Sequence, residues 1–188
     1  MNCDREQEWE TLREIRTASE TVFDGIVLHV KRDTVSLPNG SPSIREVIRH
    51  IGAVCVIPVT ENNEVIVERQ YRYPLDRIIT EIPAGKLDSA DEDRLSAIQR
   101  ELREETGYTA EEWTVLGDFH PAPAYSDEYI TMYMARKLHA GTQALDADEF
   151  LHVMKVPLAD LVGDVMAGRI SDAKTQTAVL KAARLLGV

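Results

Sequence analysis

The sequence predicts an α+β fold, namely an α/β/α sandwich on a mixed β-sheet, preceded by a small antiparallel N-terminal β unit. Segments rich in Val and Ile, separated by turn signals, are followed by a mixture of strand and helix patterns, and no internal repeat interrupts them. The chain has 188 residues, of which 44% are hydrophobic and 28% are charged. It is therefore long and apolar enough to bury the core that such a sandwich needs.

The N-terminal part of the chain changes in character near Thr21. Residues 4–20 are highly charged, and their apolar residues Trp9, Leu12 and Ile15 fit either a short helix or the start of a strand. The segment VFDGIVLHVKRDTVSL follows and ends at the turn signal Pro38-Asn39-Gly40, after which SIREVIRH resembles a further strand. We therefore expect residues 1–50 to form the N-terminal β unit and residues 51–188 to form the main domain.

The main domain begins with two β runs. We expect GAVCVIPV and VIVERQYRYP to form a β-hairpin around residues 61–64, and RIITEI to be a short strand. A helix is expected from about Asp91 to Thr106, closed by Gly107. WTVLGDFH, YITMYMARKL and FLHVMKV follow as strands, and residues 158–168 and 172–186 as helices. Ile130, Met132 and Met134 alternate on one strand face, so we expect them in the core.

Charge and composition exclude several classes of function. The chain has 21 Lys and Arg against 32 Asp and Glu, a formal net charge of −11. Because a duplex-binding protein needs a basic surface, we expect no nucleic-acid partner. The longest apolar stretch, residues 51–59, is only as long as a strand and contains Gly52 and Pro58, so we expect no contact with a membrane.

The cysteines and the start of the chain indicate the cellular compartment. The first residues, MNCDREQEWE, are acidic and contain no apolar segment of a secretory signal. Cys3 and Cys55 are too few and too far apart for a disulfide framework or a zinc site, and Cys55 is expected to be a buried small apolar residue. We therefore expect a cytoplasmic protein.

Three glutamates crowd one side of the helix expected over residues 91–106. Glu101, Glu104 and Glu105 fall within an arc of about 100°, and like charges at these spacings destabilise a helix. A solvated acidic face is one explanation, but Mg²⁺ would turn the repulsion into binding. The apolar residues Leu95, Ile98 and Leu102 would pack on the sheet. Ser89 and Glu92 fit a capping box at the start of this helix.

The segment GKLDSADEDRLSAIQRELREETGY, residues 85–108, resembles the signature box of the Nudix hydrolase superfamily. That box reads Gly, five residues, Glu, seven residues, then Arg-Glu-apolar-x-Glu-Glu-x-Gly-apolar. The matching residues are Gly85, Glu92, Arg100, Glu101, Leu102, Glu104, Glu105, Gly107 and Tyr108. Six residues rather than five separate Gly85 from Glu92. The resemblance implies a Nudix fold over residues 51–188.

The resemblance also implies roles for the residues of the box. Glu101, Glu104 and Glu105 would face a metal ion together with the carbonyl of Ala84, and Glu104 would also belong to the catalytic residues. The ion would be Mg²⁺, for which Mn²⁺ can substitute. Arg100 and Glu92 would form an ion pair that braces the helix, and Gly85 and Gly107 would be structural. Members of this family cleave a nucleoside diphosphate linked to another group.

Further motifs resemble the ADP-ribose pyrophosphatase branch of the family. Residues 81–85, Glu-Ile-Pro-Ala-Gly, match its entry to the box, and Pro123 lies sixteen residues beyond Gly107, where a proline is typical of this branch. The resemblance implies hydrolysis of ADP-ribose to AMP and ribose 5-phosphate. It also implies a homodimer in which residues 1–50 exchange and complete the partner's substrate pocket.

The same resemblance implies the substrate contacts and the general base. Arg45 and Glu46 would contact the nucleotide and Arg72 the diphosphate, since a guanidinium suits phosphate oxygens. Glu81, Pro123 and Glu128 would also lie at the substrate. The acidic loop at residues 146–149 would supply the general base, with Glu149 the first choice and Asp148 the second.

Two other functions compete with this reading. The same architecture could hydrolyse another nucleotide sugar, such as GDP-mannose. A non-catalytic module that senses a nucleotide and regulates a partner is the other alternative, although such modules tend to lose glutamates of the box.

Overall fold

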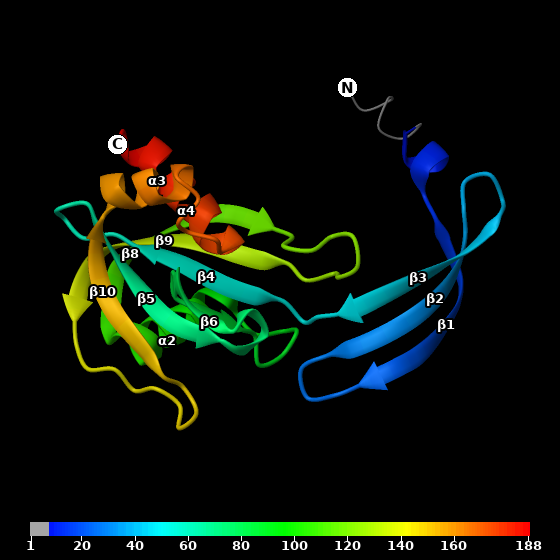
Figure 1. Cartoon of the computed structure of the whole chain (residues 1–188), viewed down its shortest axis with the longest axis horizontal. Helices are drawn as coiled ribbons and strands as arrows, with labels where there is room; N and C mark the ends of the chain where they lie inside the picture. Colours follow the sequence, from blue (N-terminus) through cyan, green and yellow to red (C-terminus); the bar gives the residue numbers. More distant parts are fainter. Residues whose placement is uncertain (1–7) are drawn as a thin grey trace. The chain divides into compact units, whose positions relative to one another are not determined.

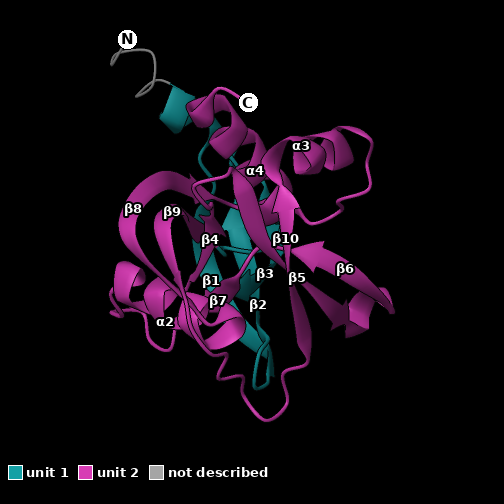
Figure 2. Cartoon of the chain, turned by 90° about the vertical axis from the view of Figure 1, so that its left-hand side faces the viewer, with its two compact units in different colours: residues 1–50, 122–128 teal, residues 51–121, 129–188 magenta. Residues whose placement is uncertain are grey.

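An antiparallel sheet forms the first of two units in the computed structural model, which describes residues 8–188 (Figures 1 and 2). Its strands, in spatial order, are β1 (Ile15–Asp24), β2 (His29–Ser36) and β3 (Pro42–Arg49). Gly40, with φ of 82°, makes the expected turn between β2 and β3. Residues 8–12 are helical, so Trp9 and Leu12 lie in a helix whereas Ile15 begins a strand. Cys3 lies outside the described residues.

A loop far along the chain also belongs to this first unit. Residues 122–128 contact β3 through a hydrogen bond from Ile48 N to Tyr125 O of 2.8 Å. The Arg49 guanidinium donates to the Asp127 carboxylate at 3.0 Å. Among the described residues, the unit therefore contains residues 8–50 and 122–128, and the second of these segments was not expected from the sequence.

The second unit, residues 51–121 and 129–188, contains two sheets. One has the order β7-β4-β9-β8, with β4 (Ala53–Pro58), β7 (Ala84–Lys86), β8 (Tyr108–Phe119) and β9 (Ile130–Ala140). It is mixed, as predicted, because β4 runs parallel to β9 and antiparallel to β7. The other has the order β10-β5-β6, with β5 (Glu64–Arg72), β6 (Arg77–Glu81) and β10 (Leu151–Pro157).

The hairpin expected around residues 61–64 is only partly correct. The turn forms, with Asn63 in a left-handed conformation and Thr60 N donating to Glu64 O at 2.8 Å. However, β4 and β5 meet in a single bridge, between Val59 and Val65, and then enter different sheets. Apolar side chains on both faces of β4 are buried against other elements, which a two-stranded hairpin could not provide.

Helices cover both faces of the mixed sheet (Figure 1). On one side, Val54 and Val56 of β4 share a core with Ile98 and Leu102 of α2 (Arg94–Thr106). On the other side, alternate residues of β4 share a core with α3 (Leu158–Met166) and α4 (Ala173–Leu186), and the expected Ile130, Met132 and Met134 lie in it. The predicted α/β/α sandwich is confirmed. No helix within residues 8–188 is long and apolar enough to cross a bilayer.

Helix α2 begins three residues later than expected. Asp93 is its N-cap and accepts hydrogen bonds from Ser96 N at 2.9 Å and Ser96 Oγ at 2.7 Å. The predicted Ser89–Glu92 capping box is therefore wrong, because Glu92 precedes the helix and accepts from Asp88 N at 2.7 Å. An Asp directly before the helix is an equally strong cap. Gly107 ends α2 with φ of 77°, as predicted.

Candidate active site

The strand β7 and the helix α2 are in close contact at Ala84 and Gly85. Ala84 N donates to Glu105 Oε2 at 3.1 Å. A Cβ atom at Gly85 would overlap the carboxylate of Glu101. The missing side chain therefore lets Glu101 lie against the backbone of the loop, and two of the predicted metal-facing carboxylates meet the segment that carries the Ala84 carbonyl.

These carboxylates lie in surroundings that disfavour charge. Burial, followed by the charges of Glu68 and Glu101, raises the pKa of Glu105 to about 10. Burial also raises the pKa of Glu101, and Glu104 and Glu149 add to that effect while Arg100 opposes it. A cation at this position would remove the repulsion that these pKa shifts reflect.

Glu68 belongs to the same carboxylate cluster, and the sequence did not predict it there. Its side chain is 1% exposed, and Oε2 has no hydrogen-bond partner within the described residues. Burial and the charge of Glu81 raise its pKa to about 8. The sequence does contain one signal for it. Glu68 directly follows the apolar run Val65–Val67 of β5, and a charged residue that is buried in such a strand usually has a partner or a function.

Arg72, Glu81 and Lys174 form a hydrogen-bonded group next to Glu68. Arg72 donates to Glu81 through Nε at 2.8 Å and Nη2 at 2.6 Å, and Lys174 Nζ donates to the same carboxylate at 2.6 Å. Although burial alone would raise the pKa of Glu81, these two cations lower it below its usual value. The structure thus joins two predicted substrate residues, and it adds Lys174, which the sequence reasoning missed.

Arg100 connects the predicted carboxylates on the outer side of α2. Its guanidinium lies 3.2 Å from Glu92, 2.9 Å from Glu101 and 3.5 Å from Glu104. It also lies 3.4 Å from Asp88. The expected contact between Arg100 and Glu92 is therefore present, and the same arginine partly neutralises the crowded glutamates, for which the sequence offers no lysine.

The acidic loop is attached to the C-terminal end of α2. Ala144 N donates to Glu104 O at 3.0 Å, and Gln143 Nε2 donates to Glu105 O at 2.6 Å. A Cβ at Gly107 would lie 2.9 Å from Gln143 N, so only glycine permits this approach. These contacts position the loop that carries Glu149.

Of the two candidate bases, Glu149 is the one whose charge reaches the carboxylate cluster. Its charge contributes to the raised pKa values of Glu68, Glu101 and Glu105. Asp148 is exposed in the same loop. The carboxylate cluster around Ala84 therefore includes glutamates from α2 and β5, and a glutamate of the acidic loop adds its charge.

Four of the predicted substrate residues belong to the first unit rather than to this cluster. Arg45 and Glu46 lie on β3, where Arg45 pairs with Glu14 and Arg32 donates to Glu46 at 3.4 Å. Pro123 and Glu128 lie in the segment 122–128. The structure places all four residues in one unit, in which β3 and the segment 122–128 are joined by a bridge between Ile48 and Ser126.

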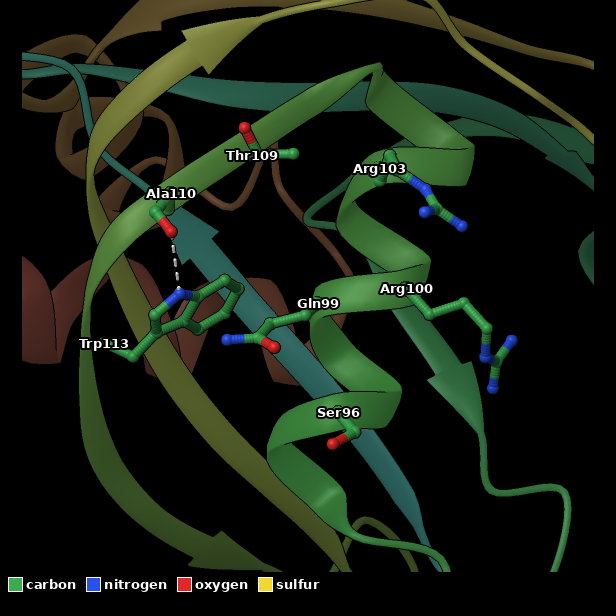
Figure 3. A pocket seen from close by; sticks show the side chains of 7 residues that line it. All are labelled: Ser96, Gln99, Arg100, Arg103, Thr109, Ala110 and Trp113. Atoms are coloured by element: carbon green, nitrogen blue, oxygen red, sulfur yellow. Dashed lines mark hydrogen bonds between the residues drawn. The ribbon is translucent and has the colours of Figure 1, made fainter.

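A pocket of about 440 Å³ lies on a different face of α2 (Figure 3). Arg100 and Arg103 project from the helix beside it, and the Trp113 indole donates to Ala110 O at 3.2 Å. Of the metal-facing and catalytic candidates, none lines this pocket; Arg100 alone is shared with the carboxylate cluster.

The donor set fits a hard dication. Within residues 8–188, no three or more His, Cys, Asp and Glu side chains already form a metal cluster. Mg²⁺ does not require one, because it usually takes one or two carboxylates and keeps several water molecules. The unpartnered Oε2 of Glu68 and the raised pKa of Glu105 show carboxyl groups buried here without a cation to stabilise their charged forms.

Two models of known families match the chain. The model of the NUDIX domain matches residues 49–176. The chain belongs to the Nudix family. A second model, described as the nucleoside diphosphate sugar hydrolase N-terminal domain, matches residues 14–48, which include β1, β2 and all but the last residue of β3. Nudix hydrolases generally use divalent metal ions, in agreement with the donor set.

Individual relatives match most of the chain. An ADP-ribose pyrophosphatase of Bacillus subtilis is 42% identical over 171 residues, which are 90% of this chain and 92% of the relative. A methanol dehydrogenase activator of Bacillus methanolicus is also 42% identical, over 86% of this chain and 88% of the relative. The crystal structure of an ADP compounds hydrolase superimposes on this chain with a TM-score of 0.83 and 24% sequence identity. The match covers 93% of this chain and 95% of the other chain, and it confirms the fold.

Proposed function

We propose that this protein hydrolyses the diphosphate of ADP-ribose to AMP and ribose 5-phosphate in a Mg²⁺-dependent reaction. The observation that carries the proposal is the buried carboxylate cluster around Ala84 and Gly85, with the guanidinium of Arg72 at its edge. The similarity to an ADP-ribose pyrophosphatase over 90% of the chain supports this substrate.

The metal-facing residues are Glu101, Glu104, Glu105 and the carbonyl of Ala84. Mg²⁺ bound there, or Mn²⁺ in its place, would neutralise charge on the diphosphate as water attacks phosphorus. Glu92 and Arg100 brace α2, so that Glu101 and Glu105 keep their positions beside Ala84 and Gly85. Gly85 leaves the space that the Glu101 carboxylate fills.

Arg72 binds the diphosphate in this proposal. Two of its nitrogens are held by Glu81, and its side chain is 42% exposed. The hydrogen bonds to Glu81 use Nε and Nη2, which leaves Nη1 for a phosphate oxygen. Glu81 therefore orients the arginine rather than contacting the phosphate itself.

Glu149 takes the proton from the attacking water, with Asp148 as the second choice. Support comes from the charge of Glu149, which acts on Glu68, Glu101 and Glu105. The loop is attached to the end of α2 by the backbone of Ala144 and the side-chain amide of Gln143, which holds the segment that carries Glu149 beside the helix.

The first unit forms a homodimer interface and completes the substrate pocket of the partner. Its strands bury few side chains, and large apolar residues such as Phe23, Val27 and Leu28 are about half exposed. Such an apolar surface is typical of an interface between proteins. Arg45, Glu46, Pro123 and Glu128 would contact the nucleotide from this unit.

Within the described residues Cys55 is a free, buried thiol, which agrees with a reducing compartment, so we place the protein in the cytoplasm.

A panel of sugar nucleotides assayed with Mg²⁺ tests the substrate. We expect ADP-ribose to show the highest kcat/KM, with AMP and ribose 5-phosphate as products in equal amounts. Equal or faster hydrolysis of GDP-mannose would overturn the assignment in favour of another nucleotide sugar.

Regulation of a partner protein is a second candidate function, because one relative bears the name of a dehydrogenase activator. The complete set of glutamates on α2 favours catalysis over binding alone. The Glu105→Gln variant separates the two, since an activator that only senses nucleotide would bind ADP-ribose without hydrolysing it, in the wild type as in the variant.

A further inference from the structure

Lys174 occupies a position that is unfavourable for a lysine in two respects. It lies in the first turn of α4, where the positive end of the helix dipole disfavours a cation. Its side chain is also about nine-tenths buried, which costs hydration of the charge. A compensating interaction must therefore keep it in place.

That interaction is with Glu81. Lys174 Nζ lies 2.6 Å from Glu81 Oε2 and 3.2 Å from Asp172 Oδ1. Although burial alone would lower the pKa of Lys174, the charges of Asp172 and Glu81 raise it, so the amine is protonated. Glu81 Oε2 also accepts from Arg72 Nη2 at 2.6 Å. One buried carboxylate oxygen thus joins α4 to the arginine.

The same turn of α4 holds the backbone beside Glu81. Thr175 Oγ1 accepts a hydrogen bond from Ile82 N at 3.0 Å, and it donates to the N-cap Asp172 at 2.6 Å. Residues 81 and 82 lead directly into the Ala84–Gly85 segment. The first turn of α4 therefore fixes both a side chain and a backbone amide next to the carboxylate cluster.

We propose that Lys174 is a positioning residue that acts through Glu81 to hold the guanidinium of Arg72 in the orientation that binds the diphosphate. The proposal rests on the proposed function, in which Arg72 contacts the substrate. Glu81 also lies directly opposite Glu68 across the β5–β6 ladder. Without Lys174, the guanidinium of Arg72 would face the buried carboxylates of both Glu68 and Glu81 by itself. Its paired N–H donors would then no longer be held on Glu81 alone.

The Lys174→Met variant tests this role by steady-state kinetics with ADP-ribose and Mg²⁺. We expect KM to rise about 10-fold and kcat to change less than about 3-fold, since a charge-assisted contact to the substrate weakens. Lys181→Met is the matched control, because Lys181 is exposed on the same helix and donates to Leu116 O at 2.6 Å. The control should keep the wild-type KM.

A double-mutant cycle with Arg72→Ala distinguishes positioning from a general structural effect. In the Arg72→Ala background, Lys174→Met should cause no further rise in KM, because its effect acts through that arginine. A rise of similar size in both backgrounds, or a wild-type KM in Lys174→Met, would overturn the proposal. If circular dichroism shows that Lys174→Met is unfolded, Lys174→Gln takes its place in the same cycle.

The two proposals fail in different ways. If the wild type does not hydrolyse ADP-ribose, the proposed substrate is wrong. The cycle is then measured with the nucleoside diphosphate of the panel that the wild type hydrolyses fastest, and additivity there would still overturn the role of Lys174.

Discussion

Glu68 and Glu81 lie directly opposite each other on β5 and β6, and each side chain is 1% exposed. Glu81 is neutralised by Arg72 and Lys174, whereas Glu68 has a buried oxygen without a partner. Like charges that face each other across a ladder destabilise a sheet. The pair therefore lowers the stability of the folded chain, and a bound cation or a proton on Glu68 would remove this destabilisation.

Replacement of Glu68 by Gln should stabilise the metal-free protein at alkaline pH. The change removes a buried negative charge opposite Glu81, and we expect the free energy of unfolding at about pH 9 to rise by roughly 1–3 kcal/mol. Urea denaturation in the presence of a chelator measures it. Glu61→Gln, in an exposed turn, serves as the control and should leave stability unchanged. A loss of stability in Glu68→Gln would contradict this account of the pair.

The stability of the metal-free protein should fall as the pH rises. The pKa values of Glu68, about 8, and Glu105, about 10, are raised by burial and by neighbouring carboxylates. The folded chain therefore holds protons that the unfolded chain has lost above about pH 5, so alkaline pH favours unfolding. We expect Tm to decrease from about pH 5 to about pH 9 with chelator, and excess Mg²⁺ to restore it most strongly at the alkaline end. A Tm independent of both would count against the metal site.

The space beside Gly85 should be required for activity. In Gly85→Ala the new Cβ would overlap the Glu101 carboxylate, so we expect a loss of about 1–3 kcal/mol of stability. Activity should fall by about 10-fold or more, because the carboxylate is displaced. Gly163→Ala on α3 is the matched control. Nothing lies within 4 Å of a Cβ there, and the substitution should add about 0.5–1 kcal/mol of helix stability. Full activity in Gly85→Ala would show that Glu101 need not contact this loop.

Cys55 should resist alkylation in the folded protein. It is fully buried, and burial raises the pKa of its thiol to about 12, so almost no thiolate is present at neutral pH. Mass spectrometry of peptides after iodoacetamide treatment should find Cys55 modified only when the protein is unfolded first. Rapid labelling of the native protein would indicate that β4 opens readily.

Much of the architecture could be predicted from local patterns. The alternation of Ile130, Met132 and Met134 placed one face of β9 in the core correctly, and Gly107 marked the end of α2. The start of α2 was missed because both Ser89 and Asp93 can cap a helix, and the choice depends on where the chain leaves β7.

The long-range pairings were not predictable in the same way. The turn at Asn63 is local, but the separation of β4 and β5 into two sheets depends on partners that lie far along the chain. Likewise, the box glutamates share one helix and could be recognised as a group, whereas Lys174 reaches Glu81 from 93 residues away. No spacing in the sequence signals such a contact.

Hydrolysis of ADP-ribose by Glu105→Gln, with Mg²⁺ in excess, tests the central claim most directly. Glu105 lies in the carboxylate cluster and accepts from Ala84 N. Glu112→Gln is the control, since Glu112 is exposed on β8 and pairs with Lys137 at 2.7 Å. The account predicts that kcat falls roughly 1,000-fold in Glu105→Gln, with Tm retained or raised, and stays at the wild-type value in the control. Wild-type turnover in Glu105→Gln would contradict a metal-dependent role for the carboxylates of α2.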